Sequence, residues 1–155
     1  MKIEIYTHTT MKSPRDRNGV CIYVIETKEL PYVQGKNPLT EMGPITDASA
    51  NEAQLTTLLR ALKRLKGSSD IEINSEAFYI KQMLERLQDY RRAGWKTAKG
   101  QPIKYRDIWE KVAEILEKQT SFSVLLAPVN EWSAWMESEA EREKKKMRNS
   151  EHAKG

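Results

Sequence analysis

The feature that most constrains the fold is the stretch from Val20 to Ile25, which is nearly continuous in apolar residues. A strand of this kind has both faces covered, whereas a half-exposed strand alternates apolar and polar residues. The stretch therefore predicts a central strand of a sheet. Four other segments have the composition of strands: Ile3–Thr7, Ile71–Ile73, Phe122–Leu126 and, less distinctly, a segment between Leu39 and Ile45.

Helices are predicted between these strands. Ser49 and Glu52 match a capping box, in which the two side chains satisfy free amides at the start of a helix. Leucines at helical spacing extend this helix to about Lys66. A second helix is expected to be capped by Ser75, a third to follow a basic turn, and a fourth to begin at Asn130.

The interleaved order of strands and helices predicts an α/β fold, with a mixed sheet of about five strands and helices packed on its faces. We expect one domain from residue 1 to 137. Residues 138–155 are dense in charges of both signs, so they are expected to form a charged helical end or a disordered tail.

Composition narrows the class of protein. The 155 residues suffice for one hydrophobic core, and no run approaches the roughly 20 apolar residues of a membrane span. The first residues lack an apolar signal segment, so we expect a cytoplasmic protein without a membrane partner. The single cysteine, Cys21, excludes an intrachain disulfide and a cysteine metal cluster. The net charge of +4 mildly favours an anionic partner.

The positive charge is concentrated in one segment, which also contains Trp95. Six basic residues and no acidic residue lie between Arg91 and Arg106: Arg91, Arg92, Lys96, Lys99, Lys104 and Arg106. Such a segment must stay in solvent. It is typical either of a solvated corner between two helices or of a surface that binds a polyanion.

The order of elements and several local motifs resemble the type 1 ribonuclease H family. The basic segment, from Trp95 through Pro102 and Lys104 to Trp109, is similar to the family's basic handle, which binds the substrate. Further matches are the strand Ile3–Thr7, the helix start at residues 51–55, the segment 74–76 and the pair at 130–131. The resemblance implies a ribonuclease H-like fold and hydrolysis of RNA in RNA–DNA hybrids, with four carboxylates holding two divalent metal ions.

The resemblance places the four carboxylate positions on His8, Gln54, Glu76 and Ala134, so only Glu76 keeps a carboxylate. No catalytic residue set is intact, and no metal is expected, because Mg²⁺ requires several oxygen ligands. The family's catalytic-histidine loop and glycine-rich first turn are also missing. A shifted alignment would leave other carboxylates available for a metal site: Asp16, Asp47, Glu131 and Glu137.

Three functions follow as alternatives. The first is a catalytically inactive homologue that binds an RNA–DNA hybrid or double-stranded RNA through the handle and needs no cofactor. Its nucleic-acid-binding residues would be Arg91, Arg92, Trp95, Lys96, Lys99, Lys104 and Arg106, with Trp95 either packed under the handle or stacked on the ligand. The second is a divergent active ribonuclease H that requires Mg²⁺ or Mn²⁺. The third is a protein-interaction scaffold that binds no nucleic acid.

Overall fold

The computed structural model describes residues 1–154, and side chains as far as Ser150. The strands are β1 (Lys2–Thr9), β2 (Gly19–Glu26), β3 (Leu39–Ile45), β4 (Asp70–Ser75) and β5 (Ser121–Leu126). The helices are α1 (Ala50–Leu62), α2 (Phe78–Glu85), α3 (Leu87–Arg92), α4 (Arg106–Glu117) and α5 (Ser133–Lys154). All the predicted strands are present, and the mixed α/β class is confirmed.

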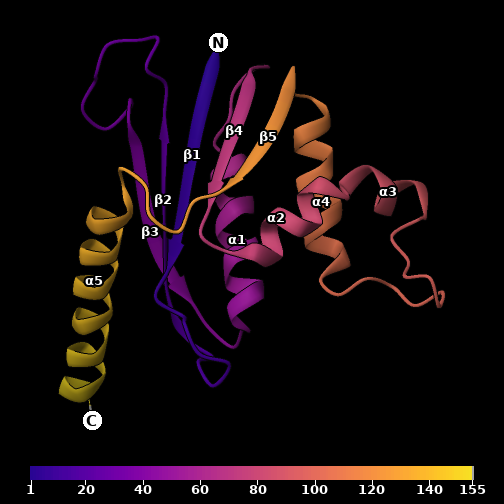
Figure 1. Cartoon of the computed structure of the whole chain (residues 1–155). Coiled ribbons are helices and arrows are strands. Elements are labelled where there is room, and N and C mark those ends of the chain that lie inside the picture. The colour runs from indigo at the N-terminus through magenta and orange to yellow at the C-terminus, as the bar shows by residue number, and fades with distance from the viewer. Residues whose placement is uncertain (155) are drawn as a thin grey trace.

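The strands form one sheet in the order β3-β2-β1-β4-β5 (Figure 1). β1 pairs antiparallel with β2 and parallel with β4, and β5 pairs parallel with β4. The centre of the sheet is therefore β1, so the prediction that residues 20–25 form the central strand is wrong by one position. β2 is nevertheless buried on both faces, because α1 packs on one side of it and α5 on the other.

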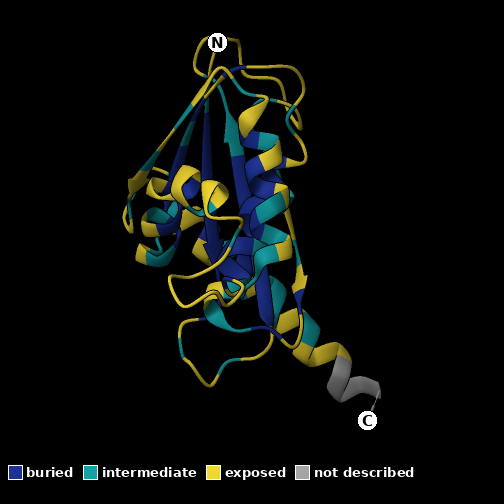
Figure 2. Cartoon of the chain, turned by 90° about the vertical axis from the view of Figure 1, so that its right-hand side faces the viewer, coloured by how far each residue is buried: buried dark blue, intermediate teal, exposed yellow. Residues whose placement is uncertain are grey.

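The larger core lies between the sheet and the layer that contains α1, α2 and α4 (Figure 2). Trp109 of α4 is fully buried in it, and its indole Nε1–H donates to the Tyr79 hydroxyl at 3.0 Å. A smaller core on the opposite face joins three valine or isoleucine side chains of β2 to Met136 and Ala140 of α5. The two cores explain the continuous apolar character of β2.

The helix starts agree only partly with the sequence. The Ser49 hydroxyl accepts the Glu52 amide at 3.0 Å, so the predicted cap of α1 is present, but the helix ends at Leu62 instead of near Lys66. Ser75 is not the cap of α2, because it is the last residue of β4 and Ala77 occupies the cap position. Beyond α2, the expected single helix is divided at Arg86, where the backbone leaves the helical region.

α5 runs along one side of the sheet as a single helix (Figure 1). It begins at Ser133, three residues later than expected, and continues through residue 137 without a break. Met147 still packs against the smaller core, so the helix is held on the sheet well beyond its first turns. Within the described residues, no helix has both the length and the apolar character needed to cross a membrane.

Candidate functional site

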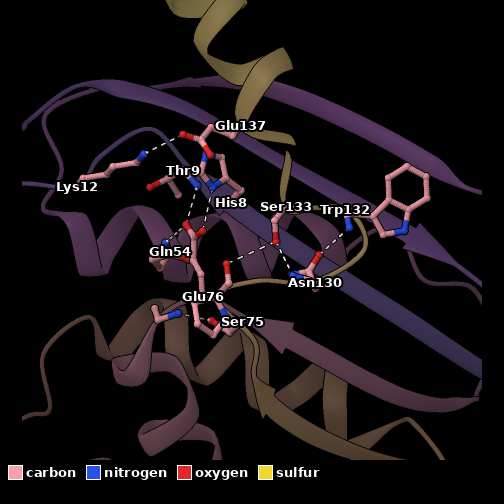
Figure 3. A network of polar contacts seen from close by, with 12 residues as sticks. His8, Thr9, Lys12, Gln54, Ser75, Glu76, Asn130, Trp132, Ser133 and Glu137 are labelled. Atoms are coloured by element: carbon pink, nitrogen blue, oxygen red, sulfur yellow. Dashed lines mark hydrogen bonds and ion pairs between the residues drawn. The ribbon is translucent and has the colours of Figure 1, made fainter. Parts of the chain in front are cut away.

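The parallel pairing of β1 and β4 brings His8 and Glu76 together. Parallel strands end at the same edge of a sheet, and His8 lies near the end of β1 while Glu76 directly follows β4. The imidazole Nδ1 of His8 lies 2.9 Å from Oε2 of Glu76. Gln54 reaches the same carboxylate from α1, with its Nε2 donating to Oε1 at 2.7 Å (Figure 3).

The Glu76 carboxylate is fully engaged by the protein. In addition to the imidazole and amide contacts, its Oε1 accepts the backbone amide of Thr9 at 3.2 Å. Burial alone raises the pKa of the Glu76 carboxyl, but hydrogen bonds from His8, Gln54 and Thr9 outweigh this effect and hold the pKa below its usual value. Glu76 is therefore an ionised acceptor whose two oxygens are both directed at protein donors.

These residues do not fit a pair of magnesium ions. Mg²⁺ needs several oxygen ligands in octahedral geometry, whereas this cluster offers one carboxylate that already accepts three donors. The neighbouring groups are an imidazole and an amide whose nitrogen points at that carboxylate. His8 Nε2 and Gln54 Oε1 are buried and have no hydrogen-bond partner among the described residues.

The last of the four positions, Ala134, lies exposed in the first turn of α5. One turn later, Glu137 pairs with Lys12 at 3.3 Å beside the cluster (Figure 3). The other carboxylates considered from the sequence also have partners. Asp16 accepts the backbone amides of Lys12 and Ser13, Asp47 pairs with Arg17, and Glu131 contacts Tyr6 and Lys28.

The structure also reveals an acidic cluster that the sequence did not predict. Carboxylate oxygens of Glu4, Glu26 and Glu131 lie within 4.8 Å of one another, near the opposite end of β1 from His8. Lys28 pairs with Glu4 and Glu131, and the Tyr6 hydroxyl donates to the same two carboxylates. Burial and these carboxylates raise the pKa of the Tyr6 hydroxyl, so it remains a donor. Protein groups therefore neutralise this cluster.

The basic segment forms a small hairpin beside the helical layer (Figure 1). Its two arms meet in a bridge between Lys96 and Pro102, and the Thr97 amide donates to the Gln101 carbonyl at 2.7 Å. Trp95 anchors the base, since its amide donates to the Tyr90 carbonyl and its carbonyl accepts the Ile103 amide. The Trp95 side chain is half-buried against the main core. This contact supports a packing role, while stacking on a ligand stays a prediction.

Side-chain contacts divide the six cations of this hairpin region into two groups. The arginines contact carboxylates: Arg91 with Glu117 at 2.7 Å, Arg106 with Glu110 at 2.6 Å and Arg92 with Asp89 at 3.9 Å. The three lysines, Lys96, Lys99 and Lys104, form no ion pair with any described residue, and all three are exposed. Lys104 lies over the Tyr105 ring, with 5.3 Å between Nζ and the ring centroid.

The strand order, the α5 helix on one face and the basic hairpin on the other side define a ribonuclease H-like fold. The RNase H family model matches residues 2–127, and the chain belongs to this family. Ribonuclease H of Clostridium botulinum (strain Hall) is 28% identical over 121 residues, which cover 77% of this chain and 78% of that protein. Ribonuclease HI of Xylella fastidiosa (strain Temecula1) is 32% identical over 78 residues, which cover 50% and 52% of the two chains.

Solved structures show the same fold. The PFV RNase H domain in solution aligns with a TM-score of 0.58 and 17% identity, covering 94% of this chain and 89% of that chain. The foamy viral protease-reverse transcriptase in complex with an RNA/DNA hybrid aligns with a TM-score of 0.64 and 16% identity, covering 86% of this chain and 18% of that chain. At these identities the similarity establishes the architecture alone.

Proposed function

We propose that this protein is a catalytically inactive member of the RNase H family that binds nucleic acid, either an RNA–DNA hybrid or double-stranded RNA, through the hairpin of residues 95–103 and its flanking cations. The observation that carries the loss of catalysis is the state of Glu76. This carboxylate is the only one of the four to remain, and donors from His8, Gln54 and Thr9 use both of its oxygens.

Binding does not depend on the metal site. Lysine and arginine contacts to phosphates provide the sequence-independent part of nucleic-acid affinity, and the exposed lysines Lys96, Lys99 and Lys104 are suited to that role. Three of the four negative charges of an active site are absent here, so a phosphate can approach His8 and Glu76 without metal ions to offset repulsion. The solved relative with an RNA/DNA hybrid supports this class of ligand.

Two alternatives remain as outcomes of the experiment. A divergent active ribonuclease H is favoured by the names of the relatives, which are ribonucleases H, but it needs a metal site that the cluster around Glu76 does not provide. A protein-interaction scaffold would retain the hairpin for folding alone, since Trp95 and Ile103 join it to the core.

The test is a gel-retention and cleavage assay with an end-labelled RNA–DNA hybrid and with double-stranded RNA, in EDTA, Mg²⁺ or Mn²⁺ and at several salt concentrations. The double variant Lys99→Glu/Lys104→Glu removes the proposed phosphate contacts. Lys36→Glu/Lys66→Glu changes the net charge equally at exposed positions outside the hairpin and serves as the matched control.

We expect retention without cleavage in all three conditions. Affinity should fall steeply with salt, and the hairpin double variant should lose at least about tenfold in affinity, because each lost phosphate contact lowers the salt slope by about 0.9 for a duplex. Metal-dependent cleavage by the unmodified protein would contradict the loss of catalysis. Absence of retention at low salt would contradict nucleic-acid binding and favour the scaffold.

A further inference from the structure

A second basic surface lies on the other side of the domain from the hairpin. The loop between β1 and β2 and the C-terminal half of α5 enclose a cleft of about 870 Å³, with residues 44–46 at its margin. Five charged residues line it: Arg15, Asp16, Arg17, Lys144 and Arg148. Four of these five are cations, and they come from segments more than 120 positions apart in the sequence.

The loop holds its arginines in place through backbone contacts. Asp16 accepts the amides of Lys12 and Ser13 at 3.0 and 3.1 Å, so its charge is used inside the loop. These bonds lower the pKa of the Asp16 carboxyl, with the Ser13 contact the largest cause. The Arg17 carbonyl accepts the Ala48 amide at 2.9 Å and ties the far end of the loop to the start of α1. The loop thus presents Arg15 and Arg17 from a fixed backbone.

The helix presents its cations to the same space. Lys144 and Arg148 are four residues apart, so they lie on one face of α5 and repel each other. Met147 packs against the smaller core and keeps this part of α5 on the sheet. Arg17 pairs with Asp47, which is highly exposed, and such exposed pairs are weak. A bound anion would relieve the repulsion among these cations, which only Asp16 offsets within the cleft.

The cleft adjoins the degenerate site. Lys12, at the start of the same loop, pairs with Glu137 beside His8 and Glu76 (Figure 3). The hairpin lies at one side of the domain and α5 at the opposite side (Figure 1). A nucleic acid that extends from the hairpin across His8 and Glu76 toward α5 therefore continues into the cleft.

We propose that the cleft formed by Arg15, Arg17, Lys144 and Arg148 is a second phosphate-binding surface, which holds the backbone of the nucleic acid bound by the hairpin. This inference rests on the proposed function. A polyanion fits better than a protein partner, because the cations on both walls alternate with little exposed apolar area and match the repeated charge of a phosphate backbone.

The test compares three proteins on a hybrid of about 24 base pairs, or roughly 80 Å at a spacing of ~3.4 Å per base pair. They are the unmodified protein, Arg15→Glu/Arg148→Glu, and the equal-charge control Lys36→Glu/Lys66→Glu. Binding is measured by fluorescence anisotropy over a range of salt concentrations, and thermal unfolding checks that each variant is folded. Arg15→Ala/Arg148→Ala replaces the cleft variant if charge reversal unfolds the protein.

We expect the cleft variant to bind about tenfold more weakly than the control and to show a salt slope smaller by about two, the value for two lost phosphate contacts. Equal affinity and slope for the cleft variant and the control would overturn this inference while leaving the role of the hairpin intact. Failure of the unmodified protein to bind would overturn the proposed function and this inference together.

Discussion

His8 and Glu76 are hydrogen-bonded, with 2.9 Å between the imidazole Nδ1 and the carboxylate Oε2, where the parallel strands β1 and β4 end. By the family resemblance, these two positions would carry carboxylates that share metal ions. Two carboxylates this close repel each other unless a cation lies between them. A histidine and a glutamate bind each other directly, so this arrangement is stable without a metal ion.

Replacement of Glu76 should destabilise the fold. In Glu76→Gln, one carboxylate oxygen becomes an amide NH₂ that faces the donors of its neighbours, so at least one buried donor loses its acceptor. We expect the free energy of unfolding to fall by about 1–3 kcal/mol. Urea unfolding measures the change. Glu114→Gln, at an exposed position of α4, is the control and should change stability by less than about 0.5 kcal/mol. Equal stability of the two variants would contradict the prediction.

The same carboxylate should contribute to acid sensitivity. The pKa of Glu76 is lowered in the folded protein, so its contribution to stability is complete above the unfolded-state value of about 4.3 and is lost as the pH falls through the folded value. We expect the stability difference between the unmodified protein and Glu76→Gln to shrink when the pH is lowered below about 4. Unfolding curves at successive pH values measure this difference. A difference that stays constant with pH would contradict the assignment.

Restoring the four carboxylates should restore metal binding. The variant contains four changes: His8→Asp, Gln54→Glu, Glu76→Asp and Ala134→Asp. Without metal it should unfold at a lower temperature than the parent, because four like charges gather at one site. Mn²⁺ at about 100 times its Kd should add about 2.7 kcal/mol of stability. Thermal unfolding with and without Mn²⁺ tests this, with the unmodified protein as control. If Mn²⁺ stabilises neither protein, the assignment of the four positions is incorrect.

Trp95 should matter more for folding than for ligand binding. Its side chain is half-buried against the main core, and its backbone joins the base of the hairpin to Tyr90 and Ile103. We expect Trp95→Ala to lower the free energy of unfolding by about 1–3 kcal/mol, whereas Trp95→Phe should keep most of the affinity for a hybrid. Chemical unfolding and anisotropy measure the two effects. Unchanged stability with lost affinity in Trp95→Phe would instead indicate stacking on the ligand.

Local sequence patterns were sufficient for most of the architecture. Strands and helices follow from apolar spacing, and the Ser49 cap follows from a short motif whose contacts are local. The division at Arg86 was not predictable, because the apolar spacing continues through it and no glycine or proline marks it. Ser75 was misassigned because a serine before a helix pattern resembles a cap, although pairing with β5 keeps it in a strand.

The sequence by itself determined the family and the loss of three carboxylates, since residue identity at an aligned position requires no coordinates. Only the tertiary structure decided how the remaining groups are used. It engages Glu76 with three donors, pairs the arginines near the hairpin with carboxylates while leaving the lysines exposed, and brings Arg15 opposite Arg148. These contacts join residues distant in the sequence, and their distances depend on strand pairing and helix packing across the whole sheet.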